Sequence, residues 1–118
     1  MPEYLIAFNN EWVSELTDFE RASREVRALR AEMESAGVLI YTGGLDETAP
    51  VFSVTPTTGE PLFTDGPYVE SKEHLGGFAL ITVPDEASAR HWAAKVATAC
   101  GWPQEVHRFR HVTRATTP

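Results

Sequence analysis

The side chains best suited to proton transfer fall in one short segment, between residues 64 and 78. In this segment Asp65 is followed directly by Gly66 and Pro67. A carboxylate half-buried in a cleft has a raised pKa and can act as a general base, which is one hypothesis for Asp65. The structural alternative is a tight turn, because Asp accepts backbone hydrogen bonds, Gly tolerates positive φ and Pro fixes φ. The sequence leaves both interpretations open.

Glu70, Lys72, Glu73 and His74 follow within five residues. If they form a single helical turn, Glu70 and His74 lie on the same face at positions i and i+4. A carboxylate beside an imidazole orients the ring and raises its basicity, as many acid–base sites require. Lys72 and Glu73 would then point toward solvent. The alternative is a solvated turn with ordinary salt bridges, each worth about 0–1 kcal/mol.

A predicted last strand, residues 105–112, carries the remaining candidate for ligand binding. Alternation along a strand puts Arg108 and Arg110 on one face, with His107 and His111 on the other. If the arginines line an open sheet face, they could bind a carboxylate or phosphate; if they point outward, they protect an edge strand from aggregation. The two histidines would lie about 13 Å apart and cannot share a metal ion. No metal site is predicted, and without a nucleotide-binding or nucleophile motif no cofactor is predicted either.

The elements that must position these residues are two helices and several short strands. Apolar residues at spacings of three and four predict a helix that starts after Asp18 and ends at Gly37. A second helix is predicted from Pro84 to Gly101. Strands are predicted over residues 4–8, 38–41, 78–83 and 105–112, with a hairpin over 51–55 and 61–64 whose prolines place it at a sheet edge. The predicted buried face of the first helix comprises Phe19, Ala22, Val26, Leu29, Met33 and Ala36.

This order of elements predicts an α+β fold of the ferredoxin-like β-α-β-β-α-β type with an inserted hairpin. Two helices would cover one face of an antiparallel sheet. The other face would be open and would need a partner or a ligand. Gly76 and Gly77, at the start of the strand over 78–83, would let another backbone or a ligand approach closely.

Composition limits the classes of function. The 118 residues suffice for one domain, predicted over 1–112, with a disordered tail over 113–118. The net charge of -7 argues against binding nucleic acid or an anionic membrane surface. The single cysteine, Cys100, cannot form an internal disulfide and is predicted to be a buried small residue. With no predicted membrane span or secretory signal, a cytoplasmic protein is expected.

The segment Thr64–Phe78 resembles the signature DGPFAETKEQLGG of DGPF-domain proteins, a branch of the YCII-related superfamily. Asp65-Gly66-Pro67, Glu70, Lys72-Glu73 and Leu75-Gly76-Gly77 match it, whereas His74 replaces the usual Gln. The resemblance implies a homodimer whose two sheets pair into a dimeric α+β barrel. It also implies an association with extracytoplasmic-function sigma factors. The acid–base histidine that some relatives carry in the first helix is missing here, around residues 24–27.

Two functions follow as hypotheses. The first is a dimeric small-molecule-binding or regulatory accessory protein. The second is a cofactor-independent acid–base enzyme of lyase, isomerase or hydrolase type, with Asp65 and His74 as catalytic residues in a cleft at the dimer interface. The residues assigned to ligand binding are Gly66, Pro67, Glu70, Lys72 and Arg108.

Overall fold

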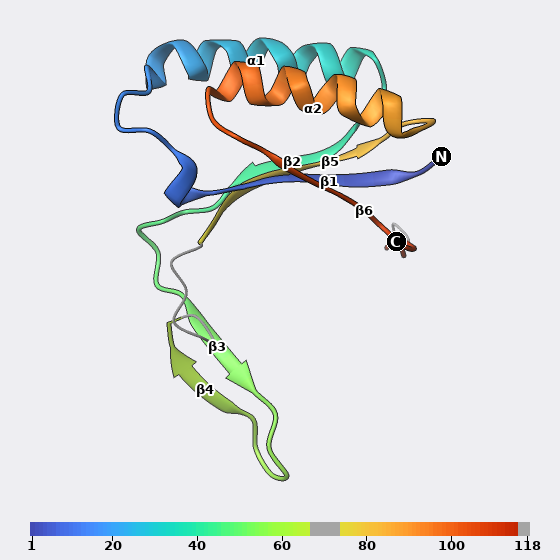
Figure 1. Cartoon of the computed structure of the whole chain (residues 1–118). Coiled ribbons are helices and arrows are strands. Elements are labelled where there is room, and N and C mark those ends of the chain that lie inside the picture. The colour runs from blue at the N-terminus through green and yellow to red at the C-terminus, as the bar shows by residue number, and fades with distance from the viewer. Residues whose placement is uncertain (67–73, 116–118) are drawn as a thin grey trace.

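A computed structural model of the chain describes residues 1–66 and 74–115. Two helices and a four-stranded sheet form the body, and a two-stranded hairpin projects from it (Figure 1). The body contains β1 (Glu3–Asn9), a short 3-10 helix η1 (Asn10–Trp12), α1 (Phe19–Ser35), β2 (Leu39–Gly44), β5 (Leu75–Thr82), α2 (Glu86–Cys100) and β6 (Glu105–Arg108). The hairpin consists of β3 (Phe52–Thr55) and β4 (Leu62–Asp65).

The four-stranded sheet has the order β2-β5-β1-β6, and each neighbouring pair is antiparallel. Strands β1 and β2 are therefore parallel to each other, with β5 between them. This is the strand order of a ferredoxin-like α+β fold, as the sequence pattern predicts.

Both helices begin and end where the sequence predicts. The Asp18 carboxylate accepts a hydrogen bond from the backbone N–H of Arg21 at 3.0 Å, and Asp85 caps α2 in the same way at 2.8 Å. Gly37 and Gly101 follow the helices with φ of 71° and 89°, a conformation that other residues rarely adopt. Local capping chemistry therefore sets the lengths of both helices.

The core lies between the helices and one face of the sheet (Figure 1). Ile6 on β1 and Ile81 on β5 are 1% and 0% exposed, and they pack with Leu29 and Met33 of α1. Small residues of α2, such as Ala89 and Ala93, complete this layer. The opposite face has no covering element among the described residues. By register and alternation it carries Leu5, Ala7, Tyr41, Phe78 and Leu80.

The hairpin differs from the expectation that it extends the edge of the main sheet. Strands β3 and β4 form a separate two-stranded sheet. Phe52 and Phe63 contact each other at 6.1 Å between ring centroids, and both remain about two-thirds exposed, at 64% and 65%. Isolated hairpins of this kind are only marginally stable in water, so these apolar side chains favour a partner surface.

The last strand is shorter than predicted, since β6 ends at Arg108 rather than Val112. Its only sheet neighbour is β1, which begins at Glu3. After the Phe109 N–H donates to the Glu3 carbonyl at 3.0 Å, the next residue of β1 would be Pro2, which has no N–H to offer. The described part of the predicted tail makes one ion pair, between Arg114 and Glu3; residues 116–118 lie outside the described residues.

Gly77 allows β2 and β5 to approach closely, as the sequence predicts. A Cβ at Gly77 would lie 3.0 Å from the Gly43 carbonyl oxygen and 3.0 Å from the Phe8 ring. We expect Gly77→Ala to lower the free energy of unfolding by about 1–3 kcal/mol, because backbone atoms cannot move aside as side chains do. Urea denaturation measures this change. Gly59→Ala is the matched control, since a Cβ added there would meet nothing within 4 Å; an equal loss in both variants would contradict the expectation.

Candidate functional site

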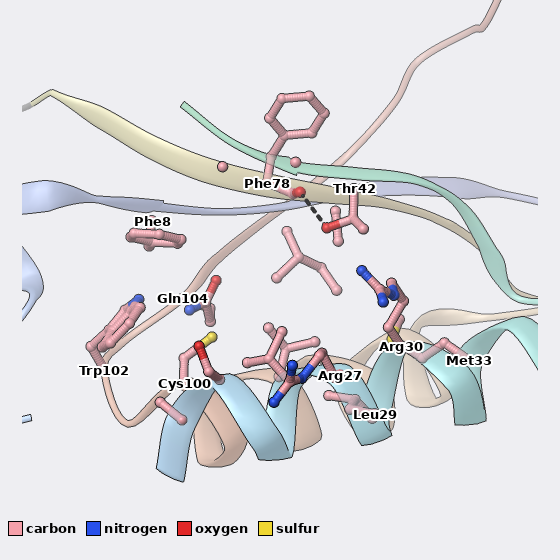
Figure 2. Close-up of a pocket in the computed structure, with 18 of the residues that line it drawn as sticks. Phe8, Arg27, Leu29, Arg30, Met33, Thr42, Phe78, Cys100, Trp102 and Gln104 are labelled. Carbon is pink, nitrogen blue, oxygen red and sulfur yellow. Dashed lines mark hydrogen bonds between the residues drawn. The ribbon is translucent and has the colours of Figure 1, made fainter. Parts of the chain in front are cut away.

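A partly open cavity of about 410 Å³ lies between α1 and the sheet (Figure 2). Its volume falls within the range of small-molecule sites, which is roughly 300–1,000 Å³. Side chains from α1, β1, β2, β5 and the end of α2 line it, together with Trp102 and Gln104 from the connection to β6. Both helices and three strands of the sheet thus contribute to one cavity on the helix-covered side of the sheet.

Small residues form part of the cavity floor. Thr42, Gly43 and Gly44 of β2 and Ala79 of β5 line it, and their short side chains leave space below α1. The Thr42 hydroxyl donates to the Phe78 carbonyl at 2.9 Å, which holds it against the sheet (Figure 2). Protein interiors are normally close-packed, so a cavity of this size is unusual and is a candidate site for a bound molecule.

The part of α1 that lines the cavity differs from the predicted core. Phe19 and Val26 belong to the predicted buried face of α1, yet they are 58% and 40% exposed. Both line the cavity instead of packing against the sheet. Ala22, Leu29 and Met33 on the same face are buried as predicted, whereas Ala36, at the C-cap that follows the helix, is exposed.

One end of the cavity combines aromatic rings with unpaired hydrogen-bond donors. The Trp102 ring lies 5.2 Å from Phe8 and 6.3 Å from Phe19, between ring centroids. The Trp102 Nε1 and Gln104 Nε2 atoms are buried, and neither has a hydrogen-bond partner among the described residues. A buried donor without an acceptor costs about 1–3 kcal/mol. A ligand oxygen at this end would remove that cost.

Two arginines of α1, Arg27 and Arg30, contribute positive charge to the cavity lining. Both side chains are exposed, and Arg30 Nε lies 3.9 Å from the Glu34 carboxylate, a loose pair. The chain as a whole carries a net charge of -7, so cations beside an apolar cavity are a local exception. They favour a ligand with a negatively charged group.

Cys100, at the end of α2, also lines the cavity. It is buried, as predicted, and burial raises the pKa of its thiol. The thiol therefore stays protonated at neutral pH and is a poor nucleophile.

The candidate base Asp65 lies elsewhere, at the end of β4 in the projecting hairpin, and is exposed. Next to it, Gly66 has a φ of 94° and its N–H donates to the Val51 carbonyl at 2.7 Å, so Gly66 serves the turn, which is the structural alternative; its assignment to ligand binding stays a prediction. The catalytic assignment of Asp65 stays a prediction. Four other candidates lie outside the described residues: Pro67, Glu70, Lys72 and Glu73.

His74 has a carboxylate neighbour, but it is one that the sequence does not suggest. Its Nδ1 lies 3.3 Å from Glu11 Oε1, on the 3-10 helix η1 that follows β1. The backbone supports this contact, since the Asn10 N–H donates to the His74 carbonyl at 2.8 Å. Both side chains are about half exposed, so the pair contributes at most about 1 kcal/mol.

Arg108 lies opposite Tyr4 in the β1–β6 register. Directly paired residues share a face, and Tyr4 is in the core, so Arg108 lies on the helix side of the sheet, exposed at its edge. It does not line the open face. Its role in ligand binding stays a prediction.

Three cavity residues escape the sequence pattern: Arg27, Trp102 and Gln104. Arg27 looks like an ordinary charged position on an amphipathic helix. Trp102 and Gln104 follow the helix-ending Gly101, where a polar or turn residue is typical, and a large aromatic at that point is the one local signal that could have marked the site.

Metal and membrane sites can be assessed for the described residues. Within 1–66 and 74–115, no group of three or more His, Cys, Asp or Glu side chains is placed to hold a metal ion. Across the same residues, no helix is both long enough and apolar enough to cross a bilayer.

Comparison with known families identifies the domain. The YCII-related domain matches residues 7–101, which include the end of β1, β2, β5, both helices and the hairpin. The chain belongs to the YCII-related family. An uncharacterized protein from Rhizobium meliloti (strain 1021) is 29% identical to this YCII-related protein over 98 residues, covering 80% of this chain and 79% of the relative.

Cys100 gives a direct test of the cavity's environment in this YCII-related protein. Because its thiol is buried and its pKa raised, we expect iodoacetamide at pH 7.5 to modify the folded protein at least tenfold more slowly than the urea-unfolded chain. Mass spectrometry follows the reaction without ambiguity, since the chain has one cysteine. Equal rates in the two states would show that Cys100 is freely accessible.

Proposed function

We propose that this YCII-related protein binds a small molecule and works as a homodimer. The observation that carries the binding function is the cavity of about 410 Å³, with buried unpaired donors at one end. Apolar cavities with a few well-placed polar groups are the usual form of a small-molecule site.

The lining favours binding over chemistry. Its described residues include no His, Asp or Glu, and its one thiol is held in the protonated form by burial. The polar groups that remain can orient a ligand but cannot accept a proton from it at neutral pH. The alternative, an acid–base enzyme that uses Asp65 and His74, stays a prediction; an exposed Asp65 would need a second subunit to enclose it.

The open sheet face supports the homodimer. Tyr41 is 62% exposed and stacks on Phe78 at 6.1 Å between centroids, beside Leu5 and Leu80. A second copy that presents the same face would bury these side chains, in the manner of the dimeric α+β barrel that the DGPF resemblance implies. The exposed rings of the hairpin supply further apolar area for such a contact. A regulatory role beside an extracytoplasmic-function sigma factor rests on the DGPF resemblance alone.

The binding function is tested with a neutral fluorescent dye. We expect N-phenyl-1-naphthylamine to bind with a rise in fluorescence, because the cavity lining is mainly apolar. Val26→Trp should lower the dye affinity at least tenfold, because Val26 lines the cavity at its partly exposed roof and a larger ring there fills the space.

Ala31→Trp is the matched control, an exposed position on the same helix that does not line the cavity. It should bind the dye as the unmodified protein does. If the unmodified protein fails to bind the dye, or if both variants bind it equally well, the proposed site is wrong.

The homodimer is tested by multi-angle light scattering. We expect the unmodified protein to have the mass of a dimer, about twice 13.1 kDa, and Tyr41→Glu to shift it to the monomer. The reason is that a dimer would bury the new charge against an apolar surface. Leu16→Glu, at a position 94% exposed in the loop before α1, should leave the mass unchanged. A monomeric unmodified protein would overturn the proposal.

A further inference from the structure

The cavity has two kinds of polar group, and they point to one class of ligand. We infer that it binds an apolar carboxylic acid that carries a second oxygen acceptor, such as a keto group, within its apolar body. This inference rests on the proposed binding function and adds the chemistry of the ligand. It follows from three parts of the lining.

The first part is the pair of unpaired donors. An indole nitrogen can only donate, so the partner of Trp102 must carry an acceptor. In Figure 2 the nitrogen atoms of Trp102 and Gln104 are turned toward each other, at the same end of the cavity. A carbonyl oxygen has two lone pairs and can accept from both. A ligand without an oxygen at this point would leave both donors buried and unpaired, so the site discriminates against it.

The second part is the set of apolar side chains in the lining. Ile6 and Ala79 come from the sheet, Leu29 and Met33 from α1, and Val96 from α2. None of these side chains can donate a hydrogen bond, and only the Met33 sulfur can accept one, weakly. The part of the ligand that contacts them should therefore be hydrocarbon, whose transfer from water drives binding.

The third part is the positive charge from α1. Arg27 and Arg30 both line the cavity, and in Figure 2 the Arg30 guanidinium lies above the helix, on the side of the sheet, whereas that of Arg27 lies beside the helix. The neighbouring carboxylates of α1 do not neutralise these two arginines fully. Glu25 pairs with Arg21 at 3.0 Å, and Glu34 lies 3.9 Å from Arg30, which is a loose contact. Arginine binds carboxylates through two parallel hydrogen bonds. A phosphate would carry nearly two charges, and a chain of net charge -7 repels it more than a carboxylate.

Three matched probes separate these contacts in displacement of N-phenyl-1-naphthylamine. The probe 9-oxodecanoate carries a carboxylate and a ketone, decanoate carries only the carboxylate, and 2-decanone carries only the ketone. We expect 9-oxodecanoate to displace the dye at a concentration at least tenfold lower than either other probe. It should also slow alkylation of Cys100, which lines the same cavity.

Variants assign each preference to its residues. Trp102→Phe keeps a ring but removes the N–H, so it should abolish the preference for 9-oxodecanoate over decanoate and keep the preference over 2-decanone. If Trp102→Phe fails to fold, Gln104→Met removes the second donor and should reduce the same preference. The double change Arg27→Gln with Arg30→Gln should abolish only the preference over 2-decanone. Arg24→Gln, an exposed arginine of α1 outside the lining, is the control for charge and should change neither.

The outcomes distinguish this inference from the proposed function. If the dye binds but decanoate displaces it as well as 9-oxodecanoate does, the buried acceptor is wrong. If 2-decanone displaces the dye as well as 9-oxodecanoate does, the inferred carboxylate of the ligand is wrong. If the dye binds and no probe displaces it, the ligand class fails while the binding function stands. If the dye does not bind, the proposed function fails, and this inference fails with it.

Discussion

The packing of α1 against the sheet is the contact on which the functional conclusions depend. Leu29 and Met33 bring this helix into the core, but part of the sheet that faces it carries glycine, alanine and threonine. Such small residues leave space between the sheet and α1. The result is a cavity where a close-packed layer would be the rule. The exposure of Phe19 and Val26 and the unpaired donors of Trp102 and Gln104 occur beside that gap, and the proposed ligand binding depends on it.

Strands β5 and β2 contribute side chains to the cavity on one face of the sheet and to the open face on the other. Ala79 lies at the cavity floor, whereas Leu80, the next residue, lies on the open face beside Tyr41. Alternation along the strand places the proposed ligand site and the proposed association surface on opposite faces of the sheet. A dimer through the open face would leave the cavity accessible from the α1 side. Both surfaces depend on the pairing of β2 with β5, which approach each other closely at Gly77.

The signature segment is more informative about family than about the site. Its turn chemistry is confirmed at Gly66, whose positive φ lets the chain leave the hairpin. The acid–base hypothesis depended on Asp65 lying in a cleft, and the side chain is exposed in the single chain. His74 pairs with Glu11, a residue 63 positions earlier, because the β1–β5 pairing brings the end of one strand to the start of the other. Local spacing cannot reveal a partner at that distance along the chain.

The sequence by itself determined the α+β class, the order of elements, both helix boundaries and the family. Those features depend on periodicity, caps and turn residues, which act over a few neighbouring positions. Tertiary structure decided that the hairpin stands apart, that β6 stops where β1 begins, and that part of the apolar face of α1 lines a hollow. A helical pattern reports which residues avoid water, but whether they meet a neighbour or a cavity depends on the size of side chains from distant strands. The candidate binding site is set by that three-dimensional mismatch of volumes, so the sequence pattern alone could not reveal it.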